Sequence, residues 1–79
     1  MINELDRVVL IEDFPDVGLK AGDVGTVILV HQGGKGFEVE FVALNGETIA
    51  VITANANQLR SAKRREIARV RAVEAPLVA

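Results

Sequence analysis

The chain of 79 residues contains no cysteine, no tryptophan and no tyrosine, and only three phenylalanines. Without cysteine it can form neither a disulfide framework nor a thiolate zinc site. The shortage of aromatic rings argues against a nucleic-acid platform on which bases stack. No apolar run is long enough to cross a membrane, and the N-terminal MINELDR does not resemble a signal peptide. We therefore expect a cytoplasmic protein.

What the chain does contain is apolar aliphatic side chains, because apolar residues make up 49% of it. This content suits a core of Val, Ile, Leu and Ala and argues against disorder. The length allows one domain, and a domain of this size has a thin margin of stability.

Charge is unevenly distributed along the chain, although its net value is only −2. Up to Leu59 there are nine acidic and three basic residues, whereas from Arg60 onward there are six basic and two acidic residues. The sequence therefore predicts an acidic domain over residues 1–62 and a basic C-terminal extension over residues 63–79.

Alternation of apolar and polar residues predicts several short strands. It is clearest where Phe37, Val39 and Phe41 alternate with glutamates, a pattern typical of a strand with one buried face. The expected strands are 5–11, 24–31, 37–44, 47–53 and a short closing strand at 59–62. Such strands indicate an all-β fold, a curled antiparallel sheet of four or five strands that closes into a small barrel.

Two pairs of residues mark expected changes of direction. Gly22 and Gly25 lie where a bulge or sharp bend would let the second strand serve both halves of the barrel. Asn45 and Gly46 both tolerate positive φ, so they predict a two-residue type I′ hairpin turn.

The C-terminal segment KRREIARVRAVEAPLVA has a different pattern. Ile67, Val70 and either Val73 or Leu77 recur at roughly helical spacing, with Ser61 as a candidate N-cap and Pro76 as the end. We expect this extension to be partly helical, although ARVRAV also alternates as a strand would. A helix this short needs a surface to pack on.

The blocks GLKAGDVGTVILV, FEVEFVALNGETIAVIT and QLR resemble a family of small bacterial SH3-like barrel proteins that is described only as a domain of unknown function. The resemblance covers roughly residues 1–61 and implies an SH3-like barrel. It also implies an antitoxin-like or accessory role beside a larger neighbouring protein. AGDVGTVILV is in addition similar to a segment of the KOW-type barrels of ribosomal proteins and transcription elongation factors.

No motif for catalysis or cofactor binding emerges from the residues. His31 is the only histidine, and we expect it to face solvent. Glu38 and Glu40 have the spacing of carboxylates on the wet face of a strand rather than of an acid/base pair. Nucleotide-binding glycine motifs are absent. The sequence predicts no catalytic, cofactor-binding or metal-binding residues and no enzymatic activity.

Two features instead indicate binding. The second and fourth strands are apolar on both faces, so some of their side chains need a cover from outside the barrel, which the extension, a second copy or another protein would supply. The basic extension offers charges for acidic groups. The predicted partner-binding residues are Ile28, Val42, Ala50, Ile52, Arg64, Arg65, Arg69 and Arg71.

These features predict a non-enzymatic protein-binding module, with an antitoxin-like or accessory role as its most concrete form. One alternative is a KOW-like barrel that binds nucleic acid through the basic cluster, in a salt-sensitive and sequence-independent way. Another is a structural homo-oligomer in which the extension of one copy meets the acidic barrel of the next.

Overall fold

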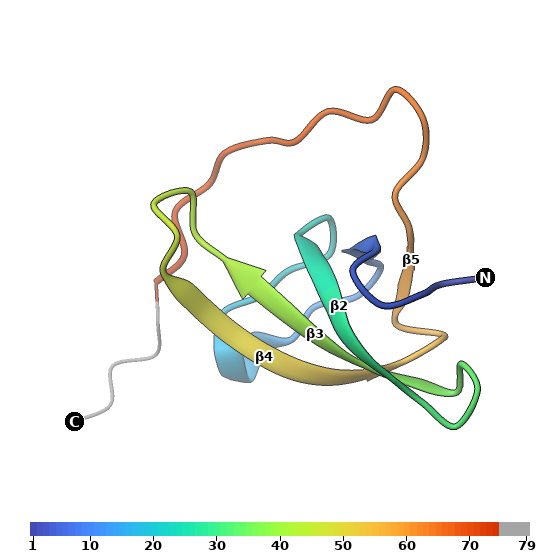
Figure 1. Cartoon of the computed structure of the whole chain (residues 1–79). Coiled ribbons are helices and arrows are strands. Elements are labelled where there is room, and N and C mark those ends of the chain that lie inside the picture. Colours follow the sequence, from blue (N-terminus) through green and yellow to red (C-terminus); the bar gives the residue numbers. More distant parts are fainter. Residues whose placement is uncertain (75–79) are drawn as a thin grey trace.

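The computed structural model describes residues 1–74, which form one antiparallel sheet of five strands (Figure 1). The strands are β1 (Arg7–Leu10), β2 (Val24–His31), β3 (Gly36–Val42), β4 (Thr48–Asn55) and β5 (Leu59–Ser61), and a 3₁₀ turn, η1 (Pro15–Val17), follows β1. Their order in the sheet is β4-β3-β2-β1-β5. The all-β prediction is confirmed, and the curled sheet resembles a small barrel that stays open between β4 and β5.

β2 is the strand that joins the two halves of the sheet. Its first residues pair with β1, and the segment from Thr26 to His31 pairs with β3. The register with β3 shifts between Val27 and Leu29, so the bulge lies at Ile28. No bulge forms at Gly22 or Gly25, but the expected alternative of a sharp bend is present at Gly22, in the turn before β2, and so is the long strand that serves both halves.

Gly22 and Gly25 have other structural roles. Gly22 has φ of +95° in the turn before β2, a conformation that favours glycine, and its N–H donates to the carbonyl of Leu10 at 2.8 Å. Gly25 allows a close approach, because a Cβ placed there would lie 2.6 Å from Cγ1 of Val39 and 2.8 Å from Cε2 of Phe41. The glycine at position 25 is thus required by packing.

The β3–β4 hairpin forms as predicted, but its turn differs. The N–H of Ala43 donates to the carbonyl of Glu47 at 2.8 Å, which leaves a three-residue loop at 44–46. Within this loop only Gly46 has positive φ, and the side-chain oxygen of Asn45 accepts from the Glu47 N–H at 3.0 Å. A type I′ turn needs positive φ at both central residues, so that prediction is wrong.

The core is entirely apolar in the described residues and draws side chains from all five strands. Phe37, Val39 and Phe41 are buried, as their alternation predicts. The buried cluster is Val8, Leu10, Leu19, Val27, Phe37, Val39, Phe41, Ile52, Ala54 and Leu59. Burial of this apolar surface is the main stabilising contribution, because no charged or polar side chain in residues 1–74 is buried with it.

The fourth strand faces the opposite way from our expectation. Ile52 is only 8% exposed and belongs to the core, and Ala50 packs against it. The register explains this, because Ile52 lies opposite Val39 and Ala50 opposite Phe41, and directly opposed residues share a face. The prediction that Ala50 and Ile52 need an outside cover is wrong, and Val51 is the residue that points outward.

Residues 62–74, which we call the strap, contain neither helix nor strand. The strap leaves β5, arches over the sheet and returns toward η1 (Figure 1). Arg65 has φ of +65°, which no right-handed helix accommodates. The expected helix is therefore absent from the strap, and Pro76 and Leu77 lie outside the described residues.

Among residues 1–74 there is no helix of the length and apolarity that a membrane span requires.

Candidate functional site

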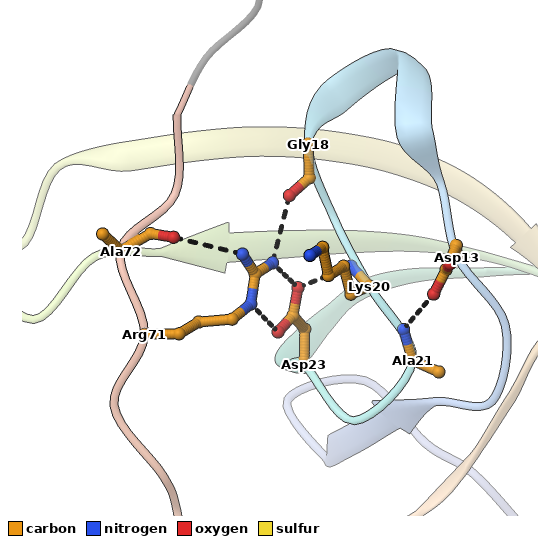
Figure 2. A network of polar contacts seen from close by, with 7 residues as sticks. All are labelled: Asp13, Gly18, Lys20, Ala21, Asp23, Arg71 and Ala72. Carbon is orange, nitrogen blue, oxygen red and sulfur yellow. Dashed lines mark hydrogen bonds and ion pairs between the residues drawn. The ribbon is translucent and has the colours of Figure 1, made fainter.

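Arg71 anchors the far end of the strap to the sheet (Figure 2). Its Nε donates to Oδ1 of Asp23 at 2.8 Å, and its Nη2 contacts Oδ2 of the same carboxylate. Nη2 also donates to the carbonyl of Gly18 at 3.0 Å, and Nη1 donates to the carbonyl of Ala72 at 3.2 Å. The guanidinium thus clamps a carboxylate in a bidentate pair and reaches the loop before β2 at the same time.

Asp23 is held ready for this pair by its own loop. Its Oδ2 accepts the backbone N–H of Lys20 at 2.8 Å. Partial burial is the largest single effect on the Asp23 carboxyl and raises its pKa. The Arg71 hydrogen bond, the Lys20 amide and the two positive charges together outweigh burial, so the pKa of Asp23 lies below its usual value.

A second ion pair fixes the near end of the strap. Arg60 on β5 donates from Nη1 to Oε1 of Glu66 at 2.9 Å and from Nη2 to Oε2 at 2.7 Å. The backbone N–H of Lys63 donates to the same carboxylate at 2.6 Å. These hydrogen bonds, with that of Arg60 the largest, lower the pKa of Glu66 to about 2.

The strap, held at both ends, encloses one side of an open groove of about 820 Å³ over the sheet. Val24 and Val42 are among the sheet residues that line it, and Val42 is 48% exposed. Ile67 and Val70 line it from the strap and remain exposed, Ile67 at 94%. The strap therefore does not fill the groove with its own apolar side chains.

Charged residues also line the groove. Arg7, Glu47 and Arg69 do so without forming an ion pair in the part of the chain that the structure describes. Lys63, Arg64 and Arg65 are exposed in the strap before the groove and are likewise unpaired within residues 1–74. The rim and its approach thus carry an excess of positive charge.

The structure brings together only part of the predicted partner-binding set. Val42, Arg69 and Arg71 line the groove, and Arg71 is already engaged with Asp23. The other predicted residues do not line it, namely Ile28, Ala50, Ile52, Arg64 and Arg65. Sequence reasoning missed Asp23 and Glu66, the two carboxylates that hold the strap. Asp23 and Arg71 are 48 residues apart, so no local spacing marks Asp23, whereas Glu66 lies six residues from its partner Arg60.

His31 does not simply face solvent, because it is half-buried beside a carboxylate. Its Nε2 lies 2.8 Å from Oε2 of Glu38, which also accepts the Thr53 hydroxyl at 2.7 Å. The Thr53 hydrogen bond, followed by that of His31, lowers the pKa of Glu38. Glu40 accepts the Thr48 hydroxyl at 2.9 Å. The two glutamates thus tie β3 to β4 on the outer face of the sheet.

No group of three or more metal-ligating side chains is placed to hold a metal ion within residues 1–74. The described residues therefore offer a groove and a positively charged strap, while Glu38 and Glu40 on the outer face have a structural role.

No curated protein and no solved structure matches the chain. A protein-family model, described as a domain of unknown function (DUF4926), matches residues 4–61. This match begins just before β1 and ends where β5 ends, so it covers the whole sheet and excludes the strap. The chain belongs to the DUF4926 family.

Proposed function

We propose that this chain is a non-enzymatic protein-binding module that holds a segment of its partner in the groove between the sheet and the strap. The observation that supports this proposal is an open groove whose apolar side chains stay exposed although a strap of the same chain passes over them. Exposed apolar surface rimmed by charge is typical of protein-interaction sites.

The chemistry of the groove specifies the class of partner. Val42 from the sheet and Ile67 and Val70 from the strap would cover apolar side chains of the bound segment. Arg69, which has no acidic partner in residues 1–74, would pair with a carboxylate. The proposed ligand is therefore a segment with both apolar and acidic side chains.

A more specific form of the proposal concerns the fold and the biological role. We place the five-stranded curled sheet among SH3-like barrels, and we propose an antitoxin-like or accessory role in which the chain covers a surface of a larger protein. The open barrel and the exposed groove support this role, because a small domain with an unfilled groove can cover an exposed segment of a larger protein.

The proposal is tested by isolating the protein that copurifies with the tagged chain and measuring its affinity for purified variants. Val42→Asp places a charge in the groove and is expected to weaken binding about tenfold or more. Ile28→Asp is the matched control, because Ile28 is 42% exposed on the sheet but does not line the groove. Equal affinities for the two variants would contradict the proposal.

One observation favours nucleic acid as a second candidate partner. Lys63, Arg64 and Arg65 lie close together in the strap without acidic partners in the described residues. Binding of this kind would weaken steeply with salt and depend on Arg64 and Arg65 but not on Val42. The acidic domain opposes it by repelling a polyanion.

A further inference from the structure

β4 forms one edge of the sheet, and its free side has no neighbouring strand in the described residues. Between Thr48 and Ala54 its only backbone partner in residues 1–74 is β3. The strand TIAVITAN contains no charged residue and no proline over its eight positions. Edge strands are normally protected from pairing by charges, prolines, bulges or short length.

The opposite edge of the same sheet is protected in this way. β5 has only three residues, and one of them is Arg60. Arg60 forms the bidentate pair with Glu66 beside this edge, and the chain continues into the strap. β4 is therefore the longer and less protected edge, and its single irregularity is the register shift at Ile49 near its start.

The backbone groups that β4 offers can be identified from its end. The N–H of Asn55 donates to Oε1 of Gln58 at 3.0 Å rather than to β3, so it points to the free side. Because alternate residues of a strand direct their N–H and C=O to the same side, those of Val51 and Thr53 point there too. Val51 is 49% exposed at the middle of this edge.

We propose that β4 pairs with β4 of a second copy of this chain, antiparallel, about a two-fold axis at Val51. Unpaired N–H and C=O groups in a row are complementary to another strand. An axis at Val51 places Val51 opposite its own symmetry mate and Ala50 opposite Ile52 of the second copy. Ala50 and Ile52 both face the core side of β4, as directly opposed residues of such a pair must.

Charge favours a second copy of this strand as the occupant. The chain is acidic over residues 1–59, so two copies that meet through the charged surfaces of their sheets bring like charges together. β4 itself is uncharged, and Glu38 and Glu40 on β3 are hydrogen-bonded to Thr53 and Thr48 of their own hairpin. Glu47 directly precedes β4, but an axis at Val51 puts the Glu47 residues of the two copies at opposite ends of the pair, roughly 26 Å apart at the usual rise per residue. In the paired dimer the two β3 strands are separated by both β4 strands, roughly 14 Å at the usual strand spacing, beyond one Debye length at physiological salt.

The test is the mass of the chain in solution, by light scattering after size exclusion and by sedimentation equilibrium. We expect a concentration-dependent dimer of twice the 8.5 kDa chain mass. Val51→Lys and Val51→Asp, which place like charges on the two-fold axis, are each expected to be monomeric. An equimolar mixture of the two variants is expected to dimerise again, because opposite charges then face each other.

Val42→Lys is the matched control, because Val42 has nearly the same exposure but lies on β3, away from the edge. It is expected to remain dimeric. Hydrogen exchange of the unaltered chain needs no variant, and it should show protection of the Val51 and Thr53 amides that rises with protein concentration. Three outcomes would overturn the proposal. The chain could stay monomeric up to about millimolar concentration, the Val51 and Thr53 amides could lack this protection, or Val51→Lys could leave the dimer intact. None of these measurements includes the partner that the groove would bind, so this proposal fails or stands independently of the proposed function.

Discussion

At the scale of single residues, close packing restricts which side chains fit at Gly25, although its backbone conformation does not. Gly25 has no unusual φ, yet its position against Val39 and Phe41 leaves no room for a side chain. Gly36, also within a strand, has only ordinary contacts of 3.7 Å or more around the position that a Cβ would occupy. Two strand glycines of the same chain therefore have different reasons for their presence.

This difference gives the first prediction. Gly25→Ala forces the Phe41 ring and Val39 to shift and is expected to lower the free energy of unfolding by about 1–3 kcal/mol, the usual cost of overpacking. Gly36→Ala, the control, is expected to be neutral or slightly stabilising, because alanine restricts the unfolded chain. Urea denaturation of both variants measures the difference, and equal midpoints would contradict the packing argument.

The second prediction concerns the protonation of Glu66. Hydrogen bonds from Arg60 and Lys63 hold its pKa at about 2. A lowered pKa means that the pair's stabilising contribution is complete above the ordinary value of 4.5 and is lost as the pH falls toward 2. In an NMR titration, Arg60→Gln should return the Glu66 midpoint toward 4.5. Arg64→Gln, which removes an unpaired arginine, should leave it low.

At the scale of elements, the strands and the strap are determined by different forces. Each strand is paired through its backbone and buries alternate side chains, whereas the strap has neither and depends on two ion pairs at its ends. The Arg60–Glu66 pair is largely open to solvent and the Asp23–Arg71 pair is only partly buried, so we expect neither to contribute much to the stability of the sheet. The strap should therefore loosen without unfolding the sheet.

The third prediction tests this separation. Arg71→Gln removes the clamp on Asp23 and Gly18 and is expected to lower the ¹⁵N heteronuclear NOE over residues 70–74. The midpoint of urea unfolding should change little, because no strap residue belongs to the buried core. Arg69→Gln is the control, because Arg69 has no ion pair in residues 1–74. A strap that remains ordered in Arg71→Gln would show that other contacts hold it.

At the scale of the whole molecule, the family match covers the same part of the chain as the buried core. The family match ends with β5, and no strap residue belongs to the buried core. We therefore expect a truncated chain of residues 1–62 to unfold cooperatively in thermal melts, with a loss of at most about 1–2 kcal/mol relative to the full chain. This fragment carries nine acidic and four basic residues, a net charge of −5. An unfolded fragment would show that the strap is part of the folding unit.

Much of the fold could be predicted from local patterns. The bounds of the second strand follow from its run of apolar, mostly β-branched residues between two glycine-rich segments, and the hairpin between the third and fourth strands follows from the Asn45-Gly46 pair. The outward direction assigned to Ile52 failed because the fourth strand is apolar on both faces, so its alternation carries no information about direction. The actual loop adds Leu44 to the turn, but the register shift at Ile49 restores the pairing of Ala50 with Phe41 and of Ile52 with Val39, which a two-residue loop at Asn45-Gly46 also gives.

Local patterns along the chain were enough to establish the all-β class, the approximate strands, the buried face of the third strand and the separation into an acidic domain and a basic extension. Those features arise from periodicity and composition, which the chain carries without folding. Three features became visible only in the folded chain. They are the bulge at Ile28, the inward direction of the Ile52 side chain, and the strap that Asp23 and Glu66 hold over the groove. They depend on register and on contacts between residues far apart in the chain, which no local pattern records.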